Sequence, residues 1–389
     1  MNPNEEAKLI KEKETTKENI QLQKPENNNI SFYFTPKNPK NLLINLAILI
    51  IFLIFVIIGI IVYIITNKPM KHFYRLLKTS PKMQSLKANE ETKYDKSLLD
   101  EKNICSTNKK FVILRRTTCQ ACGLFSYYIV HLGCIINYLK HEYIPIIEVG
   151  SFSNVFSGLK MPDNNPWEMF FNQPCGYTFN EVVKMKNVEI HECVCVCDMP
   201  DEKTVYSNNI MWNYHHQIQE KYMSVKSEIL QEANNIWYHL FGDTKNVLGI
   251  LLRGTDYTAI KPSEHAIPPT TQRAINDTIN MDNQYNYDFI FLGTEDNKIR
   301  DKFIKKFGKK LKYLLPDKII KYSYKNKNFL TYNYKVYGNL DFMKTYLLSV
   351  IILSKCVDII SARTSGAAGV FIMSKGYRNQ LVYYLGEYI

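Results

Sequence analysis

The stretch Val247–Tyr257, VLGILLRGTDY, joins an apolar run to a cluster of residues suited to ligand binding. A continuous apolar run of this length predicts a central parallel strand that is covered on both faces. The run ends at Arg253-Gly254-Thr255-Asp256, and ligands of open α/β sheets bind at the carboxyl ends of strands. The guanidinium fork of Arg253 suits phosphate oxygens, and Gly254 permits close approach of the backbone. The run therefore predicts an anion site, with an arginine–aspartate surface pair as the alternative.

A second strand end of this kind is Gly293-Thr294-Glu295-Asp296, which follows the predicted strand Tyr287–Leu292. At the carboxyl edge of the sheet, Asp296 is placed to hydrogen-bond a base or a ribose. The alternative is structural, because Thr294 or Asp296 would also cap the helix that follows.

A third strand end is Ser361–Gly369, SARTSGAAG, which follows the predicted strand Val357–Ile360 and enters a helix. Free N–H groups at a helix amino terminus, together with hydroxyl groups, bind anions. We therefore expect Thr364, Ser365 and Gly366 to bind a diphosphate, although either hydroxyl alone is explained as a cap. Three such strand ends in succession favour a ligand site.

Strand and helix patterns alternate in two regions that meet near Gly242, which predicts two Rossmann-like domains facing each other across a cleft. We expect the first domain over 106–243 and the second over 244–389. The other predicted strands are Phe111–Leu114, Tyr143–Val149, Leu311–Leu314 and Leu381–Tyr384. The predicted helices include Phe125–Leu139, Ser224–Leu240, Thr270–Met281, Asp296–Phe307 and Asp341–Ser354.

The amino-terminal part carries a predicted membrane anchor. Residues Leu46–Ile65 are twenty consecutive residues without a charge, enough for a helix to cross a hydrocarbon core of about 30 Å. We expect a disordered polar tail over 1–40, an anchor over 41–67 and a stem over 68–105. The chain would then be a single-pass membrane protein, in the Golgi or endoplasmic reticulum of a eukaryote or the inner membrane of a bacterium.

The orientation of this anchor stays open from the sequence. More lysine and arginine residues follow the span than precede it, which taken literally places the carboxyl side in the cytoplasm. A translocated carboxyl-terminal part, as in type II membrane enzymes, is the alternative. The net charge of +12 suits anionic surfaces or phosphorylated donors. No zinc finger or aromatic RNA-binding motif is present, so we expect no nucleic-acid partner.

All nine cysteines follow the anchor. The pair Cys119-Gln-Ala-Cys122 has zinc or redox spacing, and Cys193-Val-Cys195-Val-Cys197 alternates as a strand does. A zinc site needs a second matching pair or nearby histidines, and His191 beside the triplet is only a weak candidate. We therefore expect no metal site, but buried free thiols and one or two disulfides.

The order R-G-T-D-Y, F-L-G-T-E-D and S-x-x-T-S-G-A-A-G resembles the donor domain of the fucosyltransferase superfamily, which contains α1,6-, α1,2- and protein O-fucosyltransferases. The resemblance covers roughly residues 109–389 and is most specific at LLRGTDY. It implies a GT-B fold, with an acceptor domain over 106–243 and a nucleotide-sugar donor domain over 244–389. It also implies inverting transfer of fucose from GDP-fucose to a glycan or glycoconjugate, with no metal and no separate cofactor. Residues Cys122–Ser126 are similar to the superfamily's glycine-containing loop, which faces the donor.

Residue by residue, the resemblance implies that Arg253 binds the donor phosphate, with Thr294 and Asp296 near the nucleoside. It implies that Thr364, Ser365 and Gly366 bind the diphosphate. The complete set of candidate donor-binding residues is Gly123, Arg253, Gly254, Thr255, Tyr257, Thr294, Asp296, Thr364, Ser365 and Gly366.

Inverting transfer requires a base to take the acceptor proton and positive charge to hold the leaving diphosphate. Arg253 would supply charge, and Asp256, Glu264 and His265 are the candidate bases; as alternatives, Asp256 only holds Arg253 and the other two are solvated loop residues. The chain departs from the superfamily at Leu251, where many members carry a histidine. This departure supports an alternative function, a membrane-tethered protein that binds a nucleotide or glycan without catalysis.

Overall fold

The structure is a computed structural model, and it describes residues 94–106, 109–118, 122–157, 159, 165–193, 198–200, 206–315 and 339–389. The chain divides into two units, Met1–Lys87 and Ala88–Ile389, and all described residues belong to the second. None of the helices in this described part has the length and apolar character of a membrane span. The predicted anchor, Leu46–Ile65, and the predicted tail lie outside the described residues.

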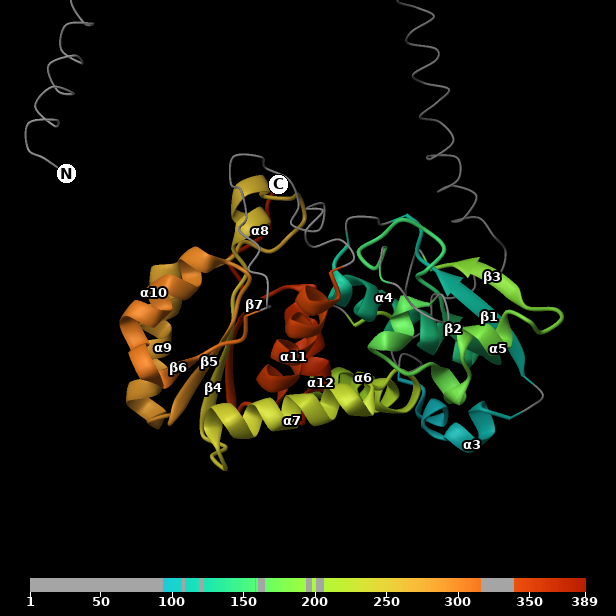
Figure 1. The fold of residues 1–389 in the computed structure, drawn as a ribbon, viewed down its shortest axis with the longest axis horizontal. Helices are drawn as coiled ribbons and strands as arrows, with labels where there is room; N and C mark the ends of the chain where they lie inside the picture. The colour runs from blue at the N-terminus through green and yellow to red at the C-terminus, as the bar shows by residue number, and fades with distance from the viewer. Residues whose placement is uncertain are drawn as a thin grey trace, which may run out of the picture. The chain divides into compact units, whose positions relative to one another are not determined.

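The first sheet has three parallel strands in the order β2-β1-β3. They are β1 (Lys110–Arg115), β2 (Tyr143–Ile147) and β3 (Glu189–Glu192). Helix α4 (Leu124–Lys140) connects β1 to β2 (Figure 1). Thirteen of its residues are buried, because its sequence is apolar around most of its circumference. The predicted strand–loop–helix–strand unit is confirmed.

Short helices complete this part of the chain: η2 (Lys96–Leu99), α3 (Glu101–Ile104), η3 (Pro166–Met169), η4 (Pro174–Gly176) and α5 (Phe179–Val182). The first of them packs on α6 (Asn209–Tyr222). Leu98 is buried, and its carbonyl oxygen accepts a hydrogen bond of 2.6 Å from the Tyr222 hydroxyl. Residues from Tyr94 onward thus belong to the packed part of the chain, although the sequence assigns residues 68–105 to a stem.

The second sheet has five parallel strands in the order β6-β5-β4-β7-β8. They are β4 (Val247–Leu251), β5 (Phe289–Gly293), β6 (Leu311–Lys312), β7 (Asp358–Ala362) and β8 (Asn379–Tyr383). Every residue of β4 is buried, as its apolar run predicts. The strand order reverses between β4 and β7, and this switch point is where open α/β sheets bind ligands.

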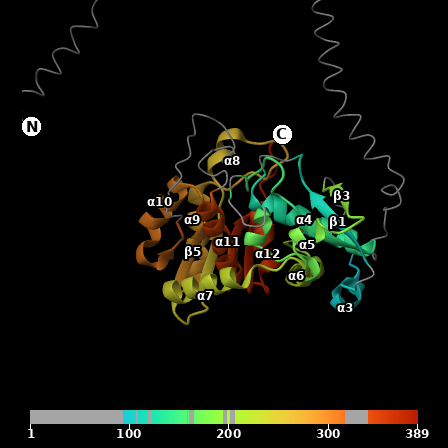
Figure 2. The same ribbon diagram turned by 45° about the vertical axis from the view of Figure 1, so that its right-hand side comes forward.

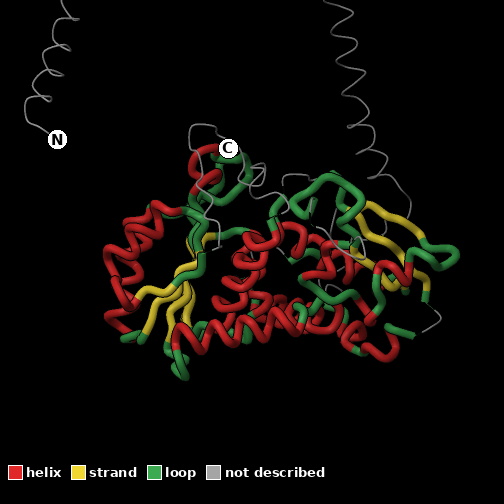
Figure 3. The backbone as a smooth tube through the Cα atoms, viewed as in Figure 1, coloured by secondary structure: helices red, strands yellow, loops and turns green. Residues whose placement is uncertain are grey.

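Helices cover both faces of the second sheet. Figures 1 and 3 show α9 (Thr271–Tyr285) and α10 (Asn297–Phe307) on one side of the strands. On the other side lie α11 (Leu340–Lys355) and α12 (Ser365–Met373), which the turned view of Figure 2 shows beside α6 and α7 (Ser227–Phe241). The remaining elements are α8 (Thr255–Ile260) and η5 (Gly308–Lys310). The α/β class with parallel sheets is therefore confirmed.

One hydrophobic core joins the two sheets. The ring of Phe125, in α4, meets the Tyr346 ring of α11 edge to face, with centroids 5.4 Å apart. A Cβ atom added to Gly369 of α12 would lie 2.3 Å from the Phe125 ring. The missing side chain at Gly369 thus brings the first turn of α4 close to α12.

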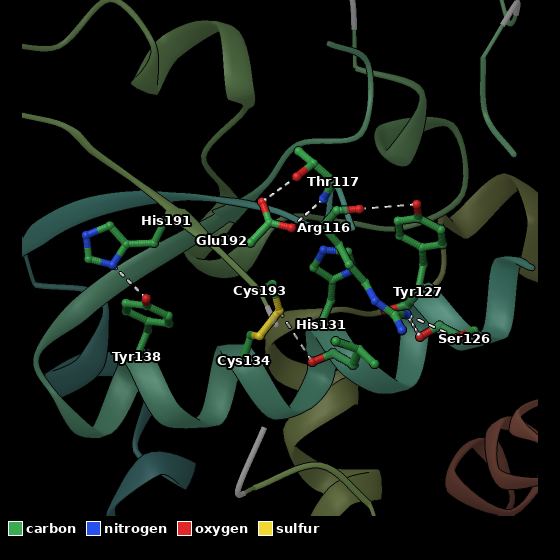
Figure 4. Close-up of a disulfide and its surroundings, with 11 residues drawn as sticks. Arg116, Thr117, Ser126, Tyr127, His131, Cys134, Tyr138, His191, Glu192 and Cys193 are labelled. Atoms are coloured by element: carbon green, nitrogen blue, oxygen red, sulfur yellow. Dashed lines mark hydrogen bonds between the residues drawn. A yellow bond between two sulfur atoms is a disulfide. The ribbon is translucent and has the colours of Figure 1, made fainter. Parts of the chain in front are cut away.

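Disulfides cross-link the first part of the unit. Cys105 pairs with Cys175, and Cys134 of α4 pairs with Cys193 at the end of β3 (Figure 4). Cys122 is also disulfide-bonded, and Cys356 is the buried free thiol among the described cysteines. Disulfides are therefore present, but these five bonded cysteines need more than the one or two disulfides that the sequence predicts, and buried free thiols are correspondingly fewer in the described part.

Candidate functional site

Arg253 lies just beyond β4, at the switch point of the second sheet. Its guanidinium carbon is 4.4 Å from the centroid of the Tyr257 ring, and its Nε atom is 3.9 Å from Glu295 Oε1. The Arg253 side chain is 27% exposed to solvent. A cation–π contact and an ion pair therefore orient a guanidinium that a ligand can still reach.

The turn after Arg253 is held by the acidic residues that follow β5. Glu295 Oε1 accepts hydrogen bonds from Gly254 N (3.2 Å) and from the Thr255 hydroxyl (3.0 Å). Asp296 Oδ2 accepts one from Thr255 N (3.0 Å). A Cβ atom on Gly254 would lie only 2.1 Å from Asp296 Oδ2, so the glycine lets this carboxylate approach the turn. The RGTD and GTED segments thus form one rigid unit.

Asp296 and Thr294 have backbone partners at the start of α10. Asp296 Oδ1 accepts a hydrogen bond from Lys298 N at 2.8 Å, and the Thr294 hydroxyl accepts one from Asp296 N at 3.2 Å. Both carboxylate oxygens of Asp296 are thus engaged by backbone N–H groups. Asp296 thus caps α10 and holds the Gly254–Thr255 turn, and its contact with a base or ribose stays a prediction. Thr294 lines a small pocket beside α11.

The Thr364-Ser365-Gly366 segment forms the amino terminus of α12. Thr364 Oγ1 accepts a hydrogen bond of 3.2 Å from Ala367 N, so Thr364 is the cap. Ser365 is partly exposed. A Cβ atom on Gly366 would lie 2.1 Å from the Tyr346 hydroxyl oxygen. A glycine is therefore needed at this position because Tyr346 of α11 packs closely against it. The first N–H groups of α12 supply a partial positive charge next to the end of β7.

Gly123 begins the helix of the first sheet that approaches this region. It is the amino-terminal cap residue of α4, and no side chain caps that end. Its carbonyl oxygen accepts hydrogen bonds from Ser126 N (3.0 Å) and Tyr127 N (3.2 Å). Because Phe125 packs on Gly369, the loop at Gly123 lies on the side of α4 that meets α12.

The candidate bases lie in and after α8. Asp256 falls within α8, but its side chain is outside the described part of the structure. Glu264 and His265 are exposed in the following loop. The His265 ring meets the edge of the Tyr257 ring, with centroids 5.3 Å apart. Of the two described candidates, His265 is thus linked through Tyr257 to Arg253.

At the carboxyl end of the first sheet, a polar cluster surrounds the start of α4 (Figure 4). Glu192 Oε1 accepts hydrogen bonds from Thr117 N (2.6 Å) and Thr118 N (3.1 Å). Arg116 Nη1 donates to the Ser126 carbonyl oxygen at 2.8 Å. Burial, with Arg116 nearby, lowers the pKa of His131 to about 3, so this histidine is neutral and suited to a structural role.

Two residues near these motifs, Glu295 and Arg363, are not among the residues that the sequence predicts to bind the donor. Glu295 forms an ion pair with Arg253 and accepts hydrogen bonds from Gly254 and Thr255. In the sequence it is visible only as a carboxylate next to a predicted helix cap. Arg363 follows β7. Its position relative to Arg253 depends on how β4 and β7 pair, which the pattern of a single sequence does not show. Within the described residues, no group of three or more histidine, cysteine, aspartate or glutamate side chains is arranged to hold a metal ion.

The sequence matches no protein-family model and no curated protein. The structure is similar to fucosyltransferase NodZ from Bradyrhizobium, with 13% identity and a TM-score of 0.39 over 68% of this chain and 92% of that chain. NodZ α1,6-fucosyltransferase soaked with GDP-fucose is similar with 13% sequence identity and a TM-score of 0.40, over 69% of this chain and 93% of that chain. POFUT1 in complex with GDP is similar with 10% sequence identity and a TM-score of 0.41, over 72% of this chain and 99% of that chain. These likenesses concern the fold, and the roles of individual residues rest on the geometry described above.

Proposed function

We propose that the chain is a glycosyltransferase that takes its sugar from a nucleoside diphosphate sugar. The observation that carries the proposal is Arg253, which follows β4 at the switch point of a parallel sheet, where the neighbouring strand β7 leads into the amino terminus of α12. Both features favour a diphosphate. The resemblance of the three motifs implies GDP-fucose as the donor, which makes the chain a fucosyltransferase.

In the proposed reaction an acceptor hydroxyl oxygen attacks the anomeric carbon of the sugar. The bond between that carbon and the β-phosphate oxygen breaks, and its electron pair leaves with the diphosphate. Arg253 and the N–H groups of α12 stabilise this added charge, while a base takes the acceptor proton. Asp256, Glu264 and His265 remain the candidates for the base, and attack opposite the leaving group inverts the anomeric centre.

We assign the donor to the second sheet and the acceptor, a glycan or glycoconjugate, to the side of the first sheet, as in a GT-B arrangement. The contact of Phe125 with Gly369 supports this assignment, because it brings the Gly123 loop of α4 toward α12. No cofactor besides the donor enters the proposed reaction.

The test is donor turnover by the full-length chain in detergent. GDP release from GDP-fucose, measured with and without a panel of glycan acceptors, should show turnover that an accepted glycan increases. The alternative, a protein that binds without catalysis, is favoured by Leu251, which is buried and apolar where many superfamily members carry a histidine. GDP binding without any turnover would establish that alternative.

Transfer should not require a divalent metal ion. Arg253 and α12 supply positive charge, and the carboxylates of Glu295 and Asp296 already accept hydrogen bonds from the Gly254–Thr255 turn. We expect turnover to be unchanged by a chelator and by added magnesium or manganese. Loss of turnover in chelator, with recovery in manganese, would contradict this prediction and make Glu295 and Asp296 the first ligands to test.

We propose that the chain is a single-pass membrane protein whose globular part lies outside the cytoplasm. The disulfides Cys105–Cys175 and Cys134–Cys193 support this side, because disulfides persist in oxidising compartments. The compartment would be the Golgi or endoplasmic reticulum lumen of a eukaryote, or the periplasm of a bacterium.

In sealed vesicles that keep the cytoplasmic face outside, an added protease should remove only the residues before the span and leave a disulfide-bonded fragment that contains Leu46–Ile65 and the globular part. Digestion of this fragment without detergent would place it in the cytoplasm, in line with the lysine and arginine distribution. A cytoplasmic marker protein on the same vesicles controls for protease activity, and a lumenal marker for vesicle integrity.

A further inference from the structure

A second arginine, Arg363, lies at the same level of the sheet as Arg253. Strands β4 and β7 are neighbours, and their register pairs Leu251 with Ser361. Arg253 and Arg363 each follow two residues after this last pair, beyond the ends of β4 at Leu251 and β7 at Ala362. Neighbouring strands are about 4.8 Å apart, so both guanidinium groups are within side-chain reach of one ligand at the switch point.

Strand alternation places both arginines on the α12 side of the sheet. Leu251 and Ile359 belong to the core that contains α11 and α12, whereas Ile250 and Ile360 belong to the core under α9 and α10. Extending this alternation past the strand ends at Leu251 and Ala362 assigns Arg253 and Arg363 to the first series, because side chains two residues apart in a strand share a face. Tyr206 supports this placement: it lines a pocket with Arg363 and packs on Phe371 of α12.

The side chain of Arg363 is 7% exposed and forms one wall of a cavity of about 320 Å³. The other lining residues are Tyr206, Ser207, Gln380, Val382 and Tyr384. The Arg363 guanidinium carbon lies 4.4 Å from the centroid of the Tyr384 ring, and its Nη2 atom lies 4.0 Å from Glu387 Oε1. The pocket thus presents a hydroxyl, an amide and a positive charge, which together suit phosphate oxygens.

The carboxyl-terminal segment Tyr384–Ile389 connects this pocket to the loop of the candidate bases. Ala266 and Glu387 form an antiparallel bridge. Ile267 N donates to the Gly386 carbonyl oxygen at 3.0 Å, and Glu264 N to that of Tyr388 at 2.8 Å. One short segment therefore fixes both the Glu264–Ile267 loop and the side chain of Arg363.

We propose that Arg363 is a second binding residue for the donor diphosphate, acting across the switch point from Arg253. Glu387 is its positioning residue. This inference rests on the proposed function and adds to it a residue on β7. When the bond to the sugar breaks, the β-phosphate gains a negative charge, and two guanidinium groups on adjacent strands would share it.

The test compares the affinities of GDP and GMP by calorimetry, using the full-length chain in detergent. Loss of a charged hydrogen-bonding group should lower the GDP affinity of Arg363→Gln by about ten- to a hundredfold. GMP, which lacks the β-phosphate, should lose less. The matched control is Arg273→Gln, because Arg273 of α9 lies over the ring of Tyr383, the neighbour of Tyr384. The control should leave both affinities unchanged.

Glu387→Gln keeps Arg363 and so tests the same point if Arg363→Gln does not fold, as a thermal unfolding curve would show. We expect a several-fold loss of GDP affinity with GMP affinity retained. Equal losses for GDP and GMP, or unchanged GDP affinity in both variants, would overturn the inference. A parent chain that binds no GDP would instead refute the proposed function. Normal GDP binding and turnover by the parent and by Arg363→Gln would refute only the role of Arg363.

Discussion

Arg253→Lys should lower kcat/KM for the sugar donor by about a hundredfold or more, because removing one preorganised donor from such a site costs about 2.7–4 kcal/mol. Lysine keeps the positive charge but not the planar fork that binds two phosphate oxygens together. It would also lose the stacking of the guanidinium on Tyr257, whose ring centroid is 4.4 Å away.

The fold should tolerate this substitution, since Arg253 is partly exposed and its ion pair with Glu295 is long, at 3.9 Å. The unfolding midpoint should therefore match that of the parent. Arg273→Lys, which changes an exposed arginine of α9, serves as the control and should keep full activity. Turnover of Arg253→Lys within a few-fold of the parent would show that Arg253 does not hold the leaving group.

Gly254→Ala should abolish most donor turnover through steric conflict at the turn. The new Cβ atom would lie 2.1 Å from Asp296 Oδ2 and 2.8 Å from Asp296 Cβ. Relief of this overlap requires Asp296 to move away from Thr255 N, which separates the turn from α10. Overpacking of this kind costs about 1–3 kcal/mol of stability, and displacement of Arg253 should lower kcat/KM by about a hundredfold.

Gly308→Ala separates this effect from the general cost of replacing a glycine. Gly308 has a φ of +53°, and a Cβ atom there meets nothing within 4 Å. This control should lose about 1–3 kcal/mol of stability through backbone strain and keep its turnover. If Gly254→Ala retains both the stability and the turnover of the parent, the turn is not the rigid unit described here.

The sequence predicts the centre of the second sheet well because β4, β5 and β7 are buried along almost their whole length. Val247–Leu252 is uninterrupted by charge, and all of β4 is buried. Helices α9, α10 and α11 begin within a residue of their predicted starts. These elements depend on local apolar patterns and caps, which a single sequence displays.

Other features depend on contacts between residues far apart in the sequence, so a single sequence does not predict them. The level of Arg363 with Arg253 follows from the pairing of β4 with β7. Glu295 acts on the Gly254 turn only because β4 and β5 are neighbours. The pairing of Cys105 with Cys175 joins positions 70 residues apart, which cysteine spacing alone does not determine. For Asp296, both a cap and a ligand fit the sequence, and its two backbone partners favour the cap.

The most direct test of the switch-point site is an experimental structure of the chain with bound GDP. We expect the diphosphate between Arg253 and the amino terminus of α12, with phosphate oxygens about 3 Å from the guanidinium and from the N–H groups of Ser365 or Gly366. GDP bound elsewhere, for example in the pocket lined by Trp212, His216 and Tyr377, with no phosphate contact to Arg253, would contradict it.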